Sequence, residues 1–375
     1  MDKKIKVMSV FGTRPEATKM CPLVLELKRR ESIESIVCLT GQHREMLDSV
    51  MDIFSLRADY DLNIMKKNQD LYSISSDILS GMKDVLNEAK PDLVLVHGDT
   101  STSFVAALSA FYAKIPVGHV EAGLRTYDRY SPFPEEMNRT LTGDIATMHF
   151  SPTSHSRDNL IREGISENIY ITGNTGLDAI RYTAKDDYTF SDSTLNSLDF
   201  SSKRFIVLTA HRRENLGAGI ENICRAVKRL VGKFDDIEVV YPVHLNPAVR
   251  NTVFNILGNC ERVHLIDPVD VTDMHNLMKR CYLCLTDSGG LQEEAPVFDL
   301  PVLVLRSETE RPEAAKAGTV KVVGTDEDMI FSEASVLLTD KAVYDKMASA
   351  ENPYGDGHAS EKIADAIEQF FGIEK

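Results

Sequence analysis

Cysteine is scarce in this 375-residue chain, which has six scattered at positions 21, 38, 224, 260, 281 and 284. Most of them lie inside apolar runs, which favours reduced packing residues over a disulfide framework. The pair Cys281 and Cys284 forms a lone CxxC in an expected strand, whereas a zinc site needs two further ligands at suitable spacing. We therefore expect buried thiols and no metal centre.

Long apolar runs and an excess of positive charge are also missing. The chain carries 57 acidic against 42 basic residues, a formal charge of -15, which argues against nucleic acid or an anionic membrane as the main partner. No run approaches the roughly 18 apolar residues of a membrane span, and the opening MDKKIKVMSVFG lacks the apolar core and cleavage site of a secretion signal. We expect a cytoplasmic protein that needs local basic groups to bind an anion.

Two common nucleotide-binding fingerprints are absent as well. The first expected strand, Lys4 to Phe11, opens on GTRPEATK, which matches neither GxGxxG nor GxxxxGK[ST]. Neither NAD nor ATP is indicated, and no cofactor is expected. Arg14 and Lys19 follow this turn at a helix amino end, where they could hold a diphosphate or be ordinary solvated cations.

Alternating strands and helices are what the sequence does contain. Its length and 43% hydrophobic content suffice for two packed domains, and the alternation predicts an α/β fold with a doubly wound sheet in each. A charged stretch rich in Ser, Asp and Thr predicts a linker at residues 181–204. We place the domains at 1–180 and 205–355, followed by an amphipathic helix at 356–375 that needs a partner surface.

Acidic residues follow two of the expected strands in the first half. The run Leu93 to His97 ends in Gly98-Asp99, and the run from Pro116 ends in Glu121. Because ligands bind outside the carboxyl ends of parallel strands, both acids are candidates for one pocket. Two purely structural alternatives stay open: Asp99 could be a helix N-cap, and Glu121 could form an ion pair with Arg125.

A third acidic position lies in the segment SPFPEEMNR. Its two prolines fix the backbone ahead of Glu135 and Glu136, which suits a rigid loop that directs a carboxylate into a site.

The second half has basic groups and glycines at its strand ends. The strand Phe205 to Thr209 is followed by His211, Arg212 and Arg213, which suits contact with an anion. The strand Tyr282 to Thr286 leads into DSGGLQEE, where glycines and helix amides could bind a phosphate. Glu294 could accept from ribose hydroxyls or complement the helix dipole.

Taken together, these motifs resemble a known family, the non-hydrolysing UDP-N-acetylglucosamine 2-epimerases. The resemblance runs in the same order from about residue 7 to residue 360. It is carried by GTRPEATK, TGQH, HGDTSTS, GHVEAGLRT, SPFPEEMNR, TGNTGLD, AHRREN, YPVHLNP, TDSGGLQEEAP and TERPEA.

The resemblance implies a fold like that of the glycosyltransferase B type. Two Rossmann-like domains would face each other across a cleft, with the last helix crossing back to the first domain. It also implies reversible epimerisation between UDP-N-acetylglucosamine and UDP-N-acetylmannosamine for cell-surface polysaccharide synthesis. The family expels UDP by anti elimination to 2-acetamidoglucal and adds it back, without redox cofactor or metal.

Site residues carry over by motif. The catalytic positions are Asp99, Glu121, Glu135 and His211. The resemblance does not tell which acid serves which face of the sugar, or whether His211 donates a proton or acts as a cation. The substrate-binding positions are Arg14, Lys19, Ser288, Gly289, Gly290, Glu294 and Arg311.

The family also implies a homodimer and, in bacterial members, a second UDP-N-acetylglucosamine as allosteric activator. The motif positions for that second site are Gln42, His43, Glu136, Arg213 and His244. Alternatives are a hydrolysing epimerase that releases N-acetylmannosamine and UDP, a UDP-sugar glycosyltransferase, a nucleotide-sugar sensor without turnover and, weakest, a dinucleotide oxidoreductase.

Overall fold

The structure, a computed structural model, describes residues 4–41, 44–66, 69–309 and 311–373. The chain divides into two compact units, one formed by residues up to 182 with those from 354 onward, the other by residues 183–353. Each unit is built on a parallel sheet, as predicted.

The first unit contains a seven-stranded sheet in the order β3-β2-β1-β4-β5-β6-β7. The chain alternates between strand and helix, and each pairing in the sheet is parallel, so this is a doubly wound fold. Its elements are β1 (Ile5–Phe11), α1 (Arg14–Arg29), β2 (Ile33–Leu39), α2 (Arg44–Ile53), β3 (Tyr60–Asp61), α3 (Leu71–Ala89), β4 (Leu93–His97), α4 (Ser101–Tyr112), β5 (Val117–Val120), α5 (Glu135–Ile145), β6 (Met148–Ser151), α6 (Ser154–Arg162), β7 (Ile169–Ile171), α7 (Thr175–Thr183) and α16 (Ala359–Phe370).

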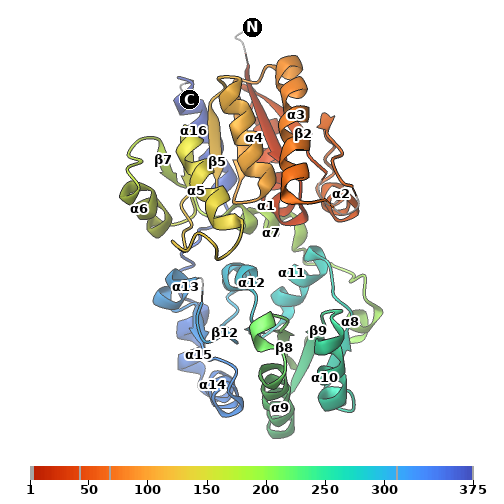
Figure 1. The fold of residues 1–375 in the computed structure, drawn as a ribbon. Coiled ribbons are helices and arrows are strands. Elements are labelled where there is room, and N and C mark those ends of the chain that lie inside the picture. The colour runs from red at the N-terminus through yellow and green to blue at the C-terminus, as the bar shows by residue number, and fades with distance from the viewer. Residues whose placement is uncertain (1–3, 42–43, 67–68, 310, 374–375) are drawn as a thin grey trace. The chain divides into compact units, whose positions relative to one another are not determined.

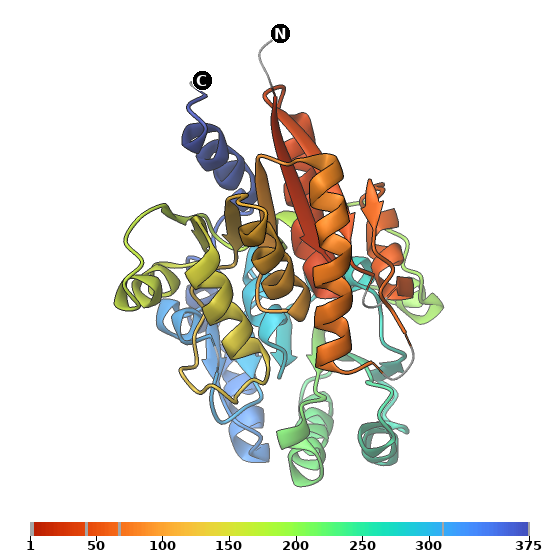
Figure 2. The ribbon, with the colours of Figure 1, turned by 45° about the horizontal axis from the view of Figure 1, so that its top comes forward.

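Helices cover both faces of this sheet, which explains why its central strands are apolar on both sides. In β4, Leu93 and Leu95 pack into the core beneath α1, whereas Val94 and Val96 pack toward α3 and α4. Figure 1 and Figure 2 show α3, α4 and α5 lying side by side over the second of these faces. The burial fixes the register of the strands and hence the place where each strand ends.

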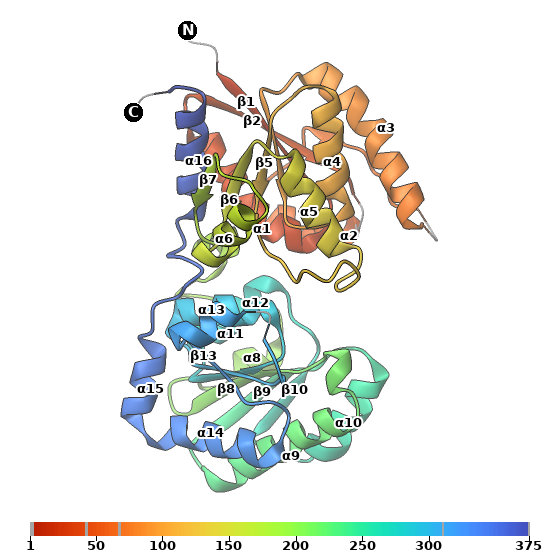
Figure 3. The same cartoon turned by 60° about the vertical axis from the view of Figure 1, so that its left-hand side comes forward.

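The last helix, α16, returns to the first unit, as the resemblance implied, and it packs against α1 (Figure 3). Arg30 binds Asp365 and Glu368 at 2.7 and 2.8 Å. Asp178 accepts hydrogen bonds from the amides of Ala359 and Ser360. These amides are in the first turn of α16, where backbone N–H groups have no acceptor within the helix. The predicted partner surface of the amphipathic tail is therefore α1.

The second unit contains a six-stranded parallel sheet in the order β10-β9-β8-β11-β12-β13. Figure 3 shows α9, α10 and α14 on one face of this sheet and α11, α12 and α13 on the other. Its elements are α8 (Ser193–Ser197), β8 (Arg204–Thr209), the 3₁₀ turn η1 (Arg213–Asn215), α9 (Ala218–Lys233), β9 (Ile237–Pro242), α10 (Pro247–Leu257), β10 (Val263–Ile266), α11 (Val271–Arg280), β11 (Leu283–Thr286), α12 (Gly289–Glu294), η2 (Ala295–Phe298), β12 (Val302–Val304), α13 (Pro312–Ala317), β13 (Val320–Val322), α14 (Glu327–Thr339) and α15 (Lys341–Ala348).

The charged stretch that the composition marks as a linker, 181–204, is largely part of the second unit. Thr183 lies 2.6 Å from the imidazole of His275, and the hydroxyl of Tyr188 donates to Asp273 at 2.8 Å. Polar residues are frequent in this segment because it runs over α11 and satisfies polar groups of that helix.

Candidate active site

Two neighbouring strands of the first unit deliver acidic residues to the same edge of the sheet. Gly98 and Asp99 follow β4, and Glu121 follows β5, its direct parallel neighbour. Gly98 has φ 63°, and a Cβ added there would lie 3.3 Å from Glu121 Oε1. Glycine therefore provides both the left-handed turn and the room for the second carboxylate. The structure brings Asp99 and Glu121 together as the strand ends predicted.

Asp99 is held by α5 and is not the N-cap of α4. Its carboxylate forms an ion pair with Arg139, and its carbonyl accepts from Asn138 Nδ2 at 2.9 Å. The N-cap is Thr100, which accepts a hydrogen bond from the amide of Ser103. The alternative that Asp99 is the helix N-cap is therefore wrong. Burial raises the pKa of Asp99, and the Arg139 guanidinium opposes that shift.

Glu121 forms an ion pair with Lys19 of α1, and its side chain is only 12% exposed. The proposed pairing with Arg125 is wrong, because Arg125 Nη2 binds Glu163 at 2.7 Å. Glu121 has φ 64°, a conformation that costs a non-glycine residue about 1 kcal/mol or more. Such strain at a partly buried carboxylate is typical of a functional position.

A neutral histidine lies behind this carboxylate. His97 Nε2 is 3.9 Å from Glu121 Oε2, and burial lowers the pKa of His97 to about 4. Lys19 is therefore the charged partner of Glu121, and His97 is an uncharged neighbour at neutral pH.

Glu135 occupies the first position of α5, after cis Ser131-Pro132 and Phe133-Pro134 bonds, and is partly buried. Residues i and i+4 share one face of a helix, so Glu135 lies on the same face of α5 as Arg139, which contacts Asp99. The SPFPEEMNR segment thus supplies the candidate acid Glu135 and also Arg139, the cation that pairs with Asp99.

Glu136 has a different role from its neighbour. It is 3% exposed, and its carboxylate accepts from the amides of Thr126 and Tyr127 at 2.8 to 3.1 Å. Arg139 Nη1 lies 3.4 Å away. Through these contacts Glu136 fixes the loop before α5, whereas the resemblance implies that it belongs to an allosteric site.

The start of α1 is fastened to this edge by a buried acid that the sequence analysis did not single out. Glu16 accepts from the amides of Gly12 and Thr13 at 3.1 and 2.9 Å and from the hydroxyl of Thr100 at 2.7 Å. Burial raises the pKa of Glu16. Arg14, the first residue of α1, is exposed, so it is open to a ligand.

In the second unit, His211 follows β8 and lies beside Asp287, which follows the adjacent strand β11. The imidazole Nδ1 is 3.4 Å from Asp287 Oδ1, and the ring stacks on His244 with centroids 5.4 Å apart. Burial lowers the pKa of His211, and the Asp287 charge opposes that shift.

Two guanidinium groups converge over the glycine turn. A Cβ added to Gly289 would lie 3.8 Å from Arg311 Nη2 and 3.9 Å from Arg212 Nη2. Ser288 and Gly289 begin α12, whose first amides add donors there. The arrangement can bind an anion such as a phosphate.

The acids after this turn are held by side chains, and neither lies in the first turn of α12. Glu293 forms an ion pair with Arg311, and Glu294 Oε2 is 3.4 Å from His275 Nε2. Glu294 lies close to Gly290, because a Cβ there would be 3.6 Å from its Oε1.

The predicted allosteric residues are distributed over both units. Gln42 and His43 lie outside the described residues. Arg213 is exposed in η1, and His244 is exposed and accepts from the amide of Asn246 at 3.1 Å.

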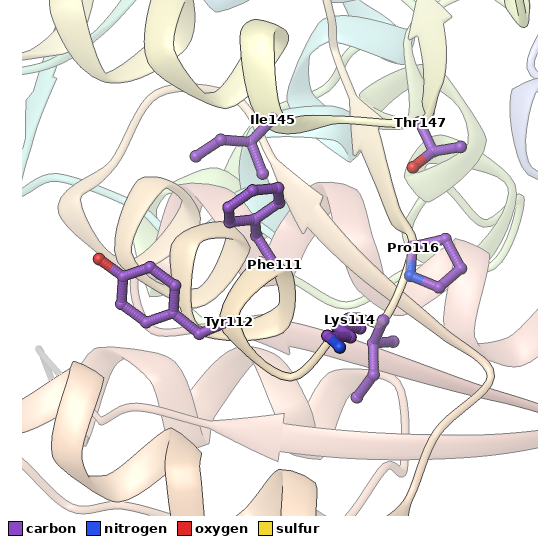
Figure 4. Close-up of a pocket in the computed structure, with 7 residues that line it drawn as sticks. Phe111, Tyr112, Lys114, Pro116, Ile145 and Thr147 are labelled. Carbon is purple, nitrogen blue, oxygen red and sulfur yellow. The ribbon is translucent and has the colours of Figure 1, made fainter.

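A separate hollow of about 610 Å³ lies at the amino ends of β5 and β6, the opposite edge of the sheet from Asp99 and Glu121 (Figure 4). Its lining is mostly apolar, with Lys114 and Thr147 as polar members. Phe111 and Tyr112 are 60% and 65% exposed. The carboxylates lie elsewhere, so this hollow is not the candidate active site.

Two contributors were not predicted as site residues: Arg139 in the first unit and Asp287 in the second. Arg212 was expected to contact an anion beside His211, but its approach to Arg311 was not predicted. The signal for Asp287 was present, because it follows a strand just as Asp99 does. Arg139 could have been found by its i+4 spacing from Glu135. The convergence of Arg212 on Arg311 depends on the fold, because 99 positions separate them.

Throughout the described ranges, every helix is too short or too polar to cross a bilayer. Across them, no three His, Cys, Asp or Glu side chains are grouped in a way that could hold a metal ion.

Comparisons with known proteins agree with the motifs. The family model for UDP-N-acetylglucosamine 2-epimerase matches residues 25–368. A Thermotoga maritima relative is 59% identical over 369 residues, covering 98% of each chain. The UDP-N-acetylglucosamine 2-epimerase of Bacillus subtilis is 53% identical over 374 residues, covering 100% of this chain and 97% of its own.

Solved structures give the same answer. The UDP-GlcNAc 2-epimerase of Neisseria meningitidis bound to UDP-GlcNAc has a TM-score of 0.85 at 48% identity, covering 97% of this chain and 100% of its own. The fold, the motif order and these matches extend over nearly the whole chain. The chain therefore belongs to the UDP-N-acetylglucosamine 2-epimerase family, a family of isomerases.

Proposed function

We propose that this protein interconverts UDP-N-acetylglucosamine and UDP-N-acetylmannosamine by inverting carbon 2 of the sugar. The observation that carries the proposal is the pair of partly buried carboxylates, Asp99 and Glu121, at the ends of adjacent strands. Each has its own cation, and the pKa of Asp99 is raised by burial. A raised pKa makes it easier for a carboxyl group to hold a proton, which suits a group that must take up and return one.

Carbon 2 poses a problem that elimination solves. Its proton is not acidic, so a base alone would remove it slowly. In the proposed step a carboxylate takes that proton, the C–H electrons form the C1–C2 double bond, and the C1–O bond breaks to release UDP. UDP then adds back while a second carboxyl group delivers a proton to the opposite face.

Asp99, Glu121 and Glu135 are the proposed proton carriers. Two or more acids are needed because one carboxylate cannot reach both faces of the ring. Glu135 lies one helical turn from Arg139, which supports a place for it beside Asp99.

The second unit supplies groups suited to the departing UDP. As the C1–O bond breaks, negative charge grows on the diphosphate, and preorganised donors stabilise it. We propose that His211 and the α12 amides do this and that Glu294 contacts the ribose. The further proposed diphosphate ligands are Arg14, Lys19, Arg212, Ser288, Gly289, Gly290 and Arg311.

Assembly, regulation and location belong to the same proposal. We infer a homodimer, and the exposed rings of Phe111 and Tyr112 are suitable for burial at its interface. A cytoplasmic location is supported by six free cysteines, since reducing compartments keep thiols unpaired. We also propose activation by a second UDP-N-acetylglucosamine, and a product that feeds cell-surface polysaccharide synthesis.

Proton NMR of the purified protein with UDP-N-acetylglucosamine in deuterated water, without added metal or NAD, tests the reaction. We expect deuterium at carbon 2 of both UDP-sugar epimers. Free N-acetylmannosamine accumulating with UDP would instead indicate a hydrolysing epimerase. No exchange at all would favour a transferase or a sensor.

A further inference from the structure

Asp287 is a fully buried carboxylate that joins the two functional turns of the second unit. It immediately precedes Ser288, and its Oδ2 accepts from the amides of His211 and Arg212, both at 2.8 Å. Asn215 Nδ2 donates to the same oxygen at 3.0 Å. The residue thus ties the turn after β8 to the turn after β11.

Its other oxygen is left for the imidazole. Oδ1 is buried and accepts no hydrogen bond within the described ranges, yet it lies 3.4 Å from His211 Nδ1. A buried carboxylate oxygen without a donor is unfavourable, and a proton on Nδ1 would supply that donor. The stacked His244 ring restricts the orientation of the imidazole.

We propose that Asp287 is a positioning residue for His211, keeping a proton on Nδ1 and holding the ring so that Nε2 serves the departing diphosphate. Nε2 lies on the other side of the ring from Nδ1. When the imidazole is charged, Nε2–H donates to a phosphate oxygen as the C1–O bond breaks, and Asp287 balances the charge. This inference rests on the proposed function for its catalytic part, whereas the pairing itself is independent of turnover.

The groups that face His211 set the direction of the expected effect. Asp287 raises the pKa of His211, while burial, His244 and Arg212 lower it. Replacing the carboxylate by an amide removes the favourable charge and retains an oxygen that can accept from the two backbone amides. Asp287→Asn is therefore expected to lower the pKa of His211.

The experiment is an NMR titration of the His211 ring without substrate, with its signals assigned through His211→Asn. The wild-type neutral ring should carry its proton on Nδ1, and Asp287→Asn should titrate at lower pH. Asn215→Ala is the matched control, because it loosens the same turn and leaves the carboxylate facing the ring. An Nε2–H tautomer in the wild type would overturn the proposal, and this outcome does not depend on whether Asp287→Asn folds.

Kinetics then test the consequence. Asp287→Asn should reduce kcat roughly 10- to 100-fold with a smaller change in KM, because the interaction strengthens as charge develops. Asp287 would be merely structural if Asn215→Ala and Asp287→Asn reduced kcat equally and left the pKa of His211 in place. Lack of epimerisation by the wild type would contradict the proposed function, and the titration would still decide the pairing.

Discussion

The sheet edge of the first unit that carries Asp99 and Glu121 and the sheet edge of the second unit that carries His211 have the same construction. In the first edge the functional groups are acids paired with cations, whereas in the second the functional group is an imidazole paired with an acid. In the first, the carboxylates of Asp99 and Glu121 follow adjacent strands and are paired with cations from helices α5 and α1. In the second, His211 follows a strand and is paired with an acid from the neighbouring strand. A parallel sheet places the reactive group, and a second element sets its charge and orientation.

The two edges also differ in the charge that they offer to a ligand. Arg139 opposes the effect of burial on the pKa of Asp99, and Glu121 forms an ion pair with Lys19. The second edge collects guanidinium groups over Gly289, which favours an anionic ligand. This contrast supports proton transfer at the first edge and diphosphate binding at the second.

The largest effect should come from removing an acid at the first edge. Glu121→Gln and Asp99→Asn should each reduce deuterium exchange at carbon 2 by roughly 10²- to 10⁴-fold, because each removes a proton carrier. UDP binding, measured by calorimetry, should change far less. Asp144→Asn, on the exposed face of α5, is the control, and a comparable loss there would argue against a specific role for the two acids.

Removing the partner of an acid should have a smaller effect that depends on pH. The cation lowers the pKa of Asp99, so Arg139→Gln should raise that pKa. If Asp99 acts as a base, the acidic limb of the pH–rate profile moves upward and activity at neutral pH falls about tenfold. Arg157→Gln removes a surface guanidinium that pairs with Asp158 and serves as control. An unshifted acidic limb would contradict this assignment.

At the second edge, filling the glycine turn should weaken binding without unfolding the protein. A methyl group at Gly289 meets the two guanidinium groups at ordinary contact distances, so the fold should tolerate Gly289→Ala. It would occupy space that a phosphate needs, and we expect the Kd for UDP to rise about tenfold, or about 1.4 kcal/mol. Gly232→Ala in α9, where nothing lies within 4 Å, is the control. Unchanged UDP affinity would place the phosphate elsewhere.

The smallest expected effect is a dependence of stability on pH, and it arises from a histidine of the first unit. Burial lowers the pKa of His119 to about 3, from an ordinary value of 6.5. The unfolded chain therefore binds the proton first, and the stability of the neutral form, complete above pH 6.5, is lost as pH falls toward 3.

His119→Asn removes this contribution. The difference in unfolding free energy between wild type and variant should shrink by about 1.4 kcal/mol per pH unit between pH 6 and pH 5. Urea denaturation measures it, and His155→Asn on the surface of α6 controls for loss of a histidine as such. A constant difference across this range would mean that His119 titrates normally in the folded protein.

The strand ends were predictable from the sequence, and their partners were not. Apolar runs that stop at Gly98-Asp99 and at Glu121 reveal where two parallel strands end, and glycine at a strand end is a local signal. The cations come from other elements: Lys19 lies 102 positions from Glu121. Spacing gives no information about such a pair until the sheet order is known.

The same limit explains the two wrong alternatives. Thr100, one residue beyond Asp99, took the N-cap because its hydroxyl reaches the Ser103 amide. Arg125 is near Glu121 in sequence but binds Glu163, the residue that follows α6. The linker interpretation of 181–204 rested on polarity, yet those polar groups are used against α11. Composition identifies polar side chains and does not distinguish solvent from a protein partner.

The most direct test of the account follows both bonds at carbon 1 and carbon 2 in one experiment. UDP-N-acetylglucosamine with oxygen-18 in the bridge between sugar and phosphate is incubated with the protein in deuterated water. The account predicts that the label scrambles into non-bridging oxygens of the β-phosphate while deuterium enters carbon 2, and that Glu121→Gln slows both. Deuterium at carbon 2 with the label still in the bridge would contradict it, because carbon 2 would then be inverted without release of UDP.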